Sequence, residues 1–328
     1  MKRQQLIIIH TIKFICAHNV FPLFLFIIIT AIAVHPAFAL RRTSVHHLFD
    51  ITGDLNAPSD VSVSRDGRIY VVDGVNSKIK IFDPKGKLIS SFGRNGSKNG
   101  EFMFPLGINI DRSGKVYIAD SGNHRVQIFT PEGIFIAEIP LPSGKEKPSD
   151  PTDVVVDETR NRCYIVDNDN HRIMVYNLAN FKLIQTYGTP GTNKLAFRYP
   201  FSITLDKDNY LYIVDVINTR VQVLNPEGLF VAFIGGWGVE KGEFFRPKGV
   251  AIDQKNSVFV SDSYMGVIQV FDATREFYSV VTDENNSSVK KFKTPTGLFI
   301  DNNNRLYVVE MLANKVSVYR IEGDTGSN

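Results

Sequence analysis

The stretch YIADSGNHRVQIF, Tyr117 to Phe129, decides the fold. Two apolar, strand-like segments flank a polar centre that contains Asp120, Asn123, His124 and Arg125. A carboxylate, an imidazole and a guanidinium so close together are typical of a catalytic cluster, but also of a tight turn between two strands. Recurrence separates the two interpretations, because a catalytic constellation occurs once per active site.

The stretch recurs in phase along the chain. Each copy has an acidic residue at the end of its first apolar segment, and successive acidic residues are 47 or 48 positions apart. The six acidic residues are Asp73, Asp120, Asp167, Asp215, Asp262 and Glu310. A proline stands 15 positions before each of them, or 16 in the third copy, where one residue is inserted. These prolines are Pro58, Pro105, Pro151, Pro200, Pro247 and Pro295.

Each unit predicts four short strands. Alternating apolar residues are bounded by turn signals such as DRSG, the Asp-x-x-Asn turn and TPEG. A period of roughly 40–50 residues with four strands indicates a propeller blade, and no helical pattern separates the strands. The last unit ends after its third strand, 315–321, and a spare strand at 45–53 precedes the first unit. We expect this spare strand to pair with the last unit and close the ring, which buries the sheet edges.

These repeats resemble the NHL family of six-bladed β-propellers, which is named after an Asn-His-Leu-type turn. The turn reads Asn123-His124-Arg125 and Asn170-His171-Arg172 here, with Asn218-Thr219-Arg220 and Asn76-Ser77-Lys78 as variants. The lead-in sequences Gly100-Glu101-Phe102 and Gly242-Glu243-Phe244 also match the family. The fifth unit departs with Met265 and Val267, and the sixth with Glu310 and Lys315. The resemblance implies an all-β, six-bladed propeller of four-stranded antiparallel blades.

The Asp-Asn-His-Arg centre is therefore interpreted as architecture. Asp and Asn favour turns because their side chains bond the local backbone and tolerate left-handed conformations. We expect Arg125, Arg172 and Arg220 to pair with the acidic residue of their own unit or of the adjacent blade. His124 and His171 are then turn residues and not ligands.

The amino end is typical of an export signal. Lys2 and Arg3 precede an uncharged run of 15 residues at 20–34, and Ala37-Phe38-Ala39 offers small residues for a signal peptidase. We expect residues 1–39 to be a secretory signal peptide or an uncleaved anchor, 40–322 the propeller, and 323–328 a C-terminal tail. The body would then be extracytoplasmic, periplasmic or secreted. Without Lys2, Arg3 and Lys13 the chain has 37 − 3 = 34 basic and 34 acidic residues, which argues against nucleic-acid binding.

Metal chemistry has little support in the sequence. Some extracellular relatives of this fold are lyases that bind zinc through histidines just after the blade-opening prolines. By resemblance, those positions are Ser59, Leu106, Thr152, Phe201, Lys248 and Thr296, and none is histidine. Asp60 and Asp153 follow two of them and could hold calcium at the pore with neighbouring hydroxyls, although capped strand ends in a solvated pore are the alternative. Cys163, alone after the leader, reads as a buried, inert thiol. We expect no catalytic residues and no cofactor.

A candidate partner-binding surface comes from the tips of the second turns. These tips are mostly small or polar in the first three units and apolar in the last three, and the only tryptophan lies in the connection between units four and five. The expected surface consists of Val216, Ile217, Trp237, Tyr264, Met265, Met311 and Leu312. A contiguous apolar patch is typical of an interaction site, unless Trp237 folds inward and covers the tips.

Three functions follow from these observations. The sequence favours a non-catalytic, extracytoplasmic scaffold that binds a protein, or else a glycan, through one face of the ring. The alternative is a metal-dependent enzyme of the lyase or lactonase kind with its site at the central pore. RNA binding or ubiquitin-ligase substrate capture, as in animal NHL proteins, is opposed by the neutral charge, the export signal and the absence of a RING-type Cys/His spacing.

Overall fold

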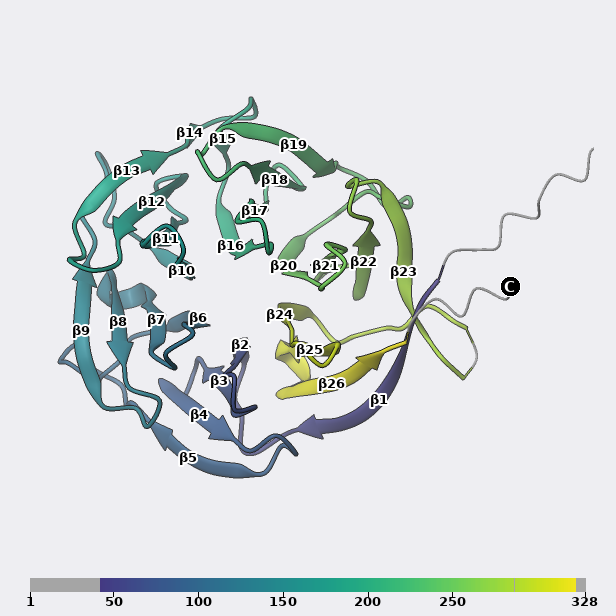
Figure 1. Cartoon of the computed structure of the whole chain (residues 1–328), viewed down its shortest axis with the longest axis horizontal. Helices are drawn as coiled ribbons and strands as arrows, with labels where there is room; N and C mark the ends of the chain where they lie inside the picture. Colours follow the sequence, from purple (N-terminus) through teal and green to yellow (C-terminus); the bar gives the residue numbers. More distant parts are fainter. Residues whose placement is uncertain (1–41, 286, 323–328) are drawn as a thin grey trace, which may run out of the picture. The chain divides into compact units, whose positions relative to one another are not determined.

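The computed structural model describes residues 42–285 and 287–322, so the expected leader and C-terminal tail lie outside the described residues. The described chain forms a ring of six blades around a central axis (Figure 1). No helix long and apolar enough to cross a membrane occurs in these two ranges.

Each blade is a four-stranded antiparallel sheet, numbered here from the first proline. Blade 1 consists of β2 (Pro58–Val63), β3 (Ile69–Asp73), β4 (Lys78–Phe82) and β5 (Leu88–Phe92). Blade 2 consists of β6 (Pro105–Ile110), β7 (Val116–Asp120), β8 (Arg125–Phe129) and β9 (Phe135–Pro140). Blade 3 consists of β10 (Pro151–Asp157), β11 (Arg162–Asp167), β12 (Arg172–Asn177) and β13 (Leu183–Tyr187).

The remaining blades follow the same plan. Blade 4 consists of β16 (Pro200–Leu205), β17 (Leu211–Asp215), β18 (Arg220–Leu224) and β19 (Phe230–Gly235). Blade 5 consists of β20 (Pro247–Ile252), β21 (Val258–Asp262), β22 (Val267–Phe271) and β23 (Phe277–Asp283). Blade 6 consists of β24 (Pro295–Ile300), β25 (Arg305–Glu310), β26 (Lys315–Ile321) and β1 (Thr43–Ile51). The short elements are β14 (Thr189–Pro190), β15 (Ala196–Phe197) and the 3₁₀ turns η1 (Ser121–Asn123) and η2 (Met311–Ala313).

The six acidic residues and the six prolines lie at the same end of their blades. Pro105 of β6 is paired with Asp120 of β7, and the other five blades have the equivalent pairing. The second strands are buried on both faces because each lies between the sheets of two neighbouring blades. This explains why their sequences, such as VYIAD and LYIVD, are nearly continuous apolar runs instead of alternating ones.

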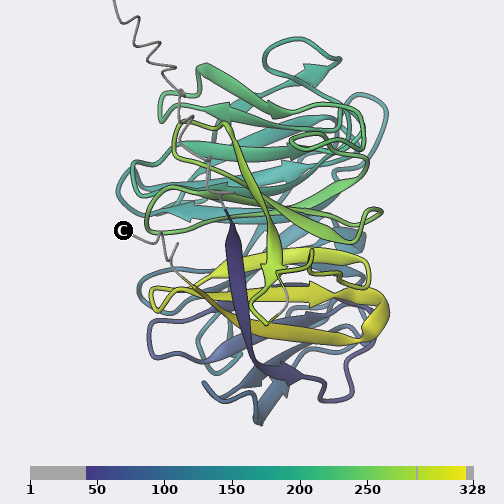
Figure 2. The same ribbon diagram turned by 90° about the vertical axis from the view of Figure 1, so that its right-hand side faces the viewer.

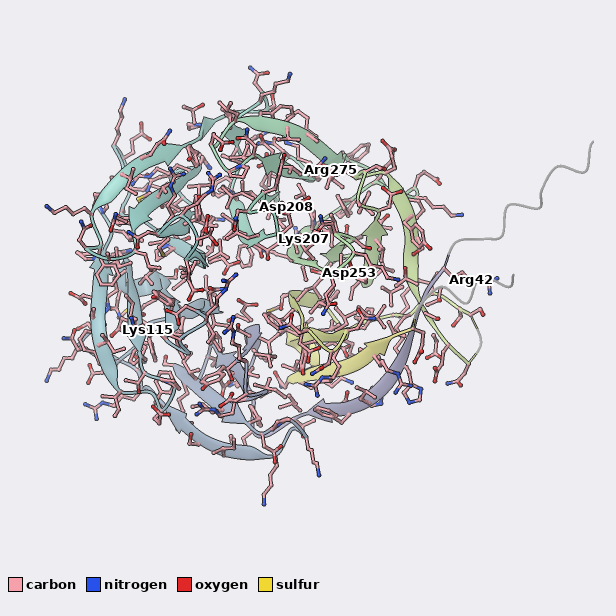
Figure 3. All side chains as sticks on the ribbon, viewed as in Figure 1. Arg42, Lys115, Lys207, Asp208, Asp253 and Arg275 are labelled. Atoms are coloured by element: carbon pink, nitrogen blue, oxygen red, sulfur yellow. The ribbon has the colours of Figure 1, made fainter. Side chains whose placement is uncertain are left out.

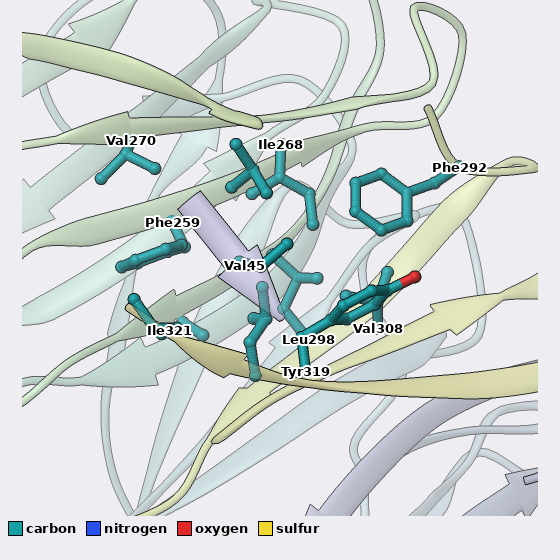
Figure 4. Close-up of a cluster of buried hydrophobic side chains, with 12 residues drawn as sticks. Val45, Phe259, Ile268, Val270, Phe292, Leu298, Val308, Tyr319 and Ile321 are labelled. Atoms are coloured by element: carbon teal, nitrogen blue, oxygen red, sulfur yellow. The ribbon is translucent and has the colours of Figure 1, made fainter. Parts of the chain in front are cut away.

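The hydrophobic core is divided among the contacts between successive blades. In Figure 4, Phe259, Ile268 and Val270 of blade 5 pack with Leu298, Val308 and Tyr319 of blade 6. Each buried Val, Leu, Ile or Phe contributes about 1.5–3 kcal/mol to stability. Blades therefore depend on their neighbours, since neither face of a single sheet is covered alone.

The spare strand at the start of the propeller closes the ring, as the sequence predicts. β1 is antiparallel to β26 from Val45 to Ile51, and so completes blade 6. Its first three residues also pair in parallel with Val281–Asp283 of β23 in blade 5. Figure 2 shows the purple β1 beside the green β23 and the yellow blade 6.

The ring has two different faces. The turns after β3, β7, β11, β17, β21 and β25 and the connections between blades lie on one face, which we call the connection face. In every blade a backbone hydrogen bond joins the turn to the connection, for example from Gly122 N–H to the Met103 carbonyl and from Ile217 N–H to the Arg198 carbonyl. The opposite face, the turn face, carries the hairpin turns after the first and third strands.

Candidate functional site on the connection face

The recurrent acidic residues are the structural centres of the connection-face corners. Each is buried and accepts a hydrogen bond from the backbone N–H that stands 17 positions earlier in the chain. Asp120, for example, accepts from Met103 N at 2.8 Å and from Asn123 Nδ2 at 2.9 Å. The carboxylate therefore fixes both the turn and the incoming connection.

The predicted arginine pairs are confirmed within single blades. The Nε atoms of Arg125, Arg172 and Arg220 lie 2.7–2.9 Å from the carboxylates five positions earlier. The histidine position of the motif has left-handed backbone geometry, with φ of 56° at His124 and 55° at His171. The recurrent Asp-Asn-His-Arg cluster therefore builds a turn between two strands.

In the fifth and sixth units, other donors form the hydrogen bonds to the recurrent acidic residue. Asp262 accepts from the backbone N–H groups of Tyr264 and Met265, which replace the missing asparagine. Glu310 accepts from Ser317 Oγ at 2.7 Å and lies 3.4 Å from Lys315 Nζ. Sequence departures at these corners therefore change the donors and leave the corner intact.

Other side chains with reactive groups are isolated from one another. Cys163 is buried, and burial raises the pKa of its thiol to about 12, which confirms the inert-thiol interpretation. His46 bonds to Glu284, and His47 bonds to Asp50 at 2.9 Å, both at the outer rim of blade 6. Across residues 42–285 and 287–322, no three His, Cys, Asp or Glu side chains converge in a way that could hold a metal ion.

Asp60 and Asp153 do face the axis, where the sequence placed them. Together with Ser59 and Thr152 they line a cavity of ≈ 10 Å³ at the connection-face end of the channel. A cavity of about 10–15 Å³ holds at most one water molecule. We call the residues around this cavity the hub.

The hub carboxylates join neighbouring blades. Asp60 Oδ2 accepts from the N–H of Ile108 in blade 2, at 3.0 Å. Asp153 Oδ2 accepts from Ile203 N at 2.9 Å and from Ser202 Oγ at 3.0 Å, both in blade 4. These hydrogen bonds give both carboxylates an architectural role between neighbouring blades.

The hub hydroxyl groups are also engaged between blades. Ser59 Oγ donates to the Leu106 carbonyl at 2.7 Å, and Thr152 Oγ1 donates to the Phe201 carbonyl at 2.8 Å. Glycine is required where the first strands approach most closely, because a Cβ at Gly297 would lie 2.3 Å from Asp60 Oδ1. The hub is thus a packed interblade joint.

Burial shifts the titration of both hub carboxyl groups. Desolvation, followed by the negative charge of Asp153, raises the pKa of Asp60 well above its usual value. Desolvation raises the pKa of Asp153 to about 7. At pH values between about 4 and 7 the folded protein therefore retains protons that the unfolded chain releases.

This shift predicts a pH-dependent effect of Asp153→Asn. A raised folded-state pKa gives stabilisation that is complete near pH 4 and is lost as the pH rises through about 7. Asn cannot ionise, so the variant should gain about 2–4 kcal/mol relative to wild type between pH 4.5 and pH 8, at ~1.4 kcal/mol per unit. Urea unfolding of both proteins at several pH values measures this difference.

Asp66→Asn is the matched control for the pH experiment. Asp66 is largely exposed, and its pKa is lowered, against its slight desolvation, by hydrogen bonds from Ser64 and Arg68. Its replacement should have a small effect of the opposite sign, seen as a relative loss of stability when the pH rises through about 4. Parallel pH profiles for wild type and Asp153→Asn would contradict the protonated hub.

Lys248 is the remaining charged group at the hub. Its Nζ lies 3.7 Å from the centroid of the Phe201 ring. Burial, followed by the positive charge of Arg246, lowers the pKa of Lys248 to about 8. From the sequence, Lys248 was considered only because related lyases have a histidine at this position. The feature that could have identified it is a basic residue directly after a blade-opening proline.

The connection face exposes the predicted apolar side chains of blades 4 to 6. Exposed fractions are 52% for Ile217, 76% for Trp237, 67% for Tyr264 and 70% for Leu312. Tyr264 stacks on Phe245 with ring centroids 4.2 Å apart. The alternative in which Trp237 folds inward is therefore wrong.

Two details of the predicted surface need correction. Val216 is only 8% exposed and packs with Val214 and Val221 in the core between blades 4 and 5. It does not belong to the exposed surface. Val75 and Phe104 of the first two blades are exposed as well, so the apolar surface is not confined to half of the ring. Met265 and Met311 are partly exposed.

The turn face has a larger opening, with a volume of ≈ 310 Å³, at the other end of the axis. Figure 3 shows Lys207, Asp208 and Asp253 on the inner turns of blades 4 and 5. Several rim groups are paired, for example Asp111 Oδ2 with Tyr117 Oη at 3.1 Å. We therefore place the candidate site on the connection face.

Comparison with known proteins agrees with this architecture. The family model DUF5128, described as a 6-bladed beta-propeller, matches residues 54–142 and 113–212. Human NHL repeat-containing protein 3 is 32% identical over 131 residues, which cover 36% of this chain and 37% of that protein. The chain is a six-bladed β-propeller, and part of it is similar to NHL repeat-containing proteins. The protein brain tumor of Drosophila melanogaster is 25% identical to this propeller over 145 residues, 42% of this chain and 13% of that protein.

Solved structures resemble this six-bladed propeller in fold alone. A streptogramin B lyase structure superposes with a TM-score of 0.61 at 14% identity, covering 85% of this chain and 98% of that one. A catalytically inactive virginiamycin B lyase from Staphylococcus aureus with quinupristin gives 0.58 at 16% identity, covering 81% and 80%. The matches span only 13–37% of the length of the curated relatives.

Proposed function

We propose that this NHL propeller is a non-catalytic, extracytoplasmic scaffold that binds a partner protein through its connection face. The observation that carries the proposal is the exposure of Ile217, Trp237, Tyr264 and Leu312 on one face of blades 4 to 6. Trp, Tyr and Met are enriched at the centres of protein interfaces. The exposure of these side chains to water contributes nothing to the stability of the folded ring.

The hub gives less support to a lyase or lactonase activity. Its cavity of ≈ 10 Å³ is too small for an organic substrate. The carboxylates and hydroxyls that a metal would need already bond to neighbouring blades. The likeness to lyase structures, at 14–16% identity, concerns the fold.

The test begins with affinity capture of the exported protein and identification of the captured proteins by mass spectrometry. Binding of each purified candidate is then measured with wild type and with Trp237→Ala/Tyr264→Ser. We expect the double variant to bind at least about tenfold more weakly, because central aromatic residues contribute most of the binding energy.

Leu229→Ser is the matched control. Leu229 is 61% exposed in the hairpin turn between β18 and β19, on the turn face of the same blade as Ile217. It should leave partner binding unchanged. Equal binding by wild type and the Trp237→Ala/Tyr264→Ser variant would refute the proposed function, and circular dichroism of all three proteins would verify that the fold is intact.

A further inference from the structure

Four basic residues stand beside the blade-opening prolines, on the connection face of blades 4 to 6. Arg198, Arg246 and Lys293 stand one or two positions before the blade-opening prolines, and Lys248 directly follows Pro247. We call these four residues the basic arc. The corresponding positions of blades 1 to 3 contain no lysine or arginine. At these positions beside the prolines, basic residues therefore occur only in blades 4 to 6.

Carboxylates of the protein do not neutralise the basic arc. None of its four side chains forms an ion pair with any residue in the described ranges 42–285 and 287–322. Among the buried acids nearby, Asp215 is paired with Arg220 and Glu310 with Lys315. Asp262 has four backbone N–H donors and no basic partner. Asp60 and Asp153 share the hub cavity with Lys248 but are engaged by donors of neighbouring blades.

Within the described part of the chain, residues 42–285 and 287–322, the Lys248 ammonium is positioned by an aromatic ring and has no hydrogen-bond acceptor. Its ammonium lies 3.7 Å from the centre of the Phe201 ring, an arrangement that fixes the cation but leaves its hydrogen-bond donors available. The charge of neighbouring Arg246 is repulsive and, after burial, lowers the pKa of Lys248. An anionic group between the two side chains would relieve this repulsion.

Apolar side chains lie directly beside the basic arc. Phe245, next to Arg246, stacks on Tyr264, and the N–H of Ser263 bonds to the Arg246 carbonyl at 2.9 Å. Trp237 is bridged to Phe244 through the backbone. The cations near the axis and the aromatic rings around them thus belong to one continuous part of blade 5.

We propose that the basic arc binds an acidic, extended segment of the partner protein. Carboxylate side chains of the segment would meet Arg246 and Lys248, and its aromatic or aliphatic side chains would pack on Trp237 and Tyr264. Charge-assisted bonds to arginine and lysine are about twice as strong as neutral ones. The small hub cavity means that the segment lies across the axial mouth and does not enter it. This proposal rests on the proposed function and specifies its partner.

Two synthetic peptides test the charge requirement. The probe is acetyl-Asp-Phe-Asp-Leu-Asp-amide, and its neutral analogue has asparagine at each aspartate. Trp237 is the only tryptophan of the chain, so its emission reports binding at the site itself. We expect the acidic peptide to bind at least about tenfold more tightly than the neutral one, and its affinity to fall as salt is raised from 50 to 500 mM.

Charge removal at the basic arc should abolish this preference. Arg246→Gln/Lys248→Met should weaken the acidic peptide about tenfold and leave the neutral peptide unchanged. The matched control is Lys207→Gln/Lys255→Gln, which removes two exposed charges from the turn face of blades 4 and 5. This control should retain the wild-type affinity for both peptides, which separates a local effect from a change in net charge.

The outcomes distinguish the two proposals. No preference of wild type for the acidic peptide, or an equal loss in both charge variants, would overturn the acidic-segment proposal. Saturable binding of a single-stranded oligonucleotide at the arc, without binding of the acidic peptide, would also overturn it. If partner binding depends on Trp237 but is insensitive to salt and to Arg246→Gln/Lys248→Met, the scaffold function stands and only its acidic ligand is refuted.

Discussion

Asp120→Ala should destabilise the propeller by about 3–5 kcal/mol, the loss measured when one partner of a buried ion pair is removed. The Asp120 carboxylate is buried and receives four donors: the N–H of Met103, Asn123 Nδ2, Arg125 Nε and Gln127 Nε2. Its removal leaves these donors without their acceptor. The Arg125 guanidinium retains Glu138, at 2.8 Å, as its carboxylate partner.

Equilibrium urea unfolding measures this loss. Asp66→Ala is the control, because the Asp66–Arg68 pair has a similar distance, 2.7 Å, but the aspartate is 55% exposed. An exposed ion pair contributes about 0–1 kcal/mol. A loss at Asp120 no larger than the loss at Asp66 would show that the recurrent carboxylates do not hold the corners together.

The corner result shows why the fold was predictable from the sequence. Six in-phase copies of one hydrogen-bonding motif determine six equivalent corners, and the strands between them follow from alternating burial. The last strand of blade 6 was predicted for the same reason, because the sixth unit lacked a fourth strand and the strand before the first unit belonged to no repeat. The prediction did not include the parallel pairing of Thr43–Val45 with β23, because strand periodicity contains no information about a second partner.

The candidate site was less predictable. The six in-phase copies place Val216 and Ile217 at a turn tip, but only the folded turn decides that Val216 is buried and Ile217 is exposed. The hydrogen bonds of Asp60 and Asp153 run to adjacent blades. They were not predictable, because the sequence of a single repeat does not determine the distance between blades. The basic arc was not predicted, because its four residues belong to different repeats and only the folded ring places them on one face.

Removal of β1 should open the ring. Val45 and Ile51 are buried, and they alone contribute about 3–6 kcal/mol at 1.5–3 kcal/mol per fully buried residue. The strand also provides the antiparallel ladder with β26 and the contact between Thr43 Oγ1 and Ser279 Oγ at 2.6 Å. Since domains are stable by only about 5–15 kcal/mol, a chain that begins at Gly53 should be largely unfolded or aggregated.

Adding the missing strand as a separate peptide distinguishes the loss of ring closure from a general effect of truncation. A synthetic peptide of residues 42–53 can supply the missing strand to the exposed edge of β26, because strand addition uses the free backbone donors and acceptors of that edge. We expect the peptide to restore a monomeric protein with cooperative melting, measured by analytical size exclusion and circular dichroism. The same peptide with Val45→Asp and Ile51→Asp should not, since each aspartate would bury an unpaired charge. Cooperative unfolding of the truncated chain at the wild-type urea midpoint, without peptide, would mean that five complete blades and one three-stranded blade are self-sufficient and that β1 does not close the ring.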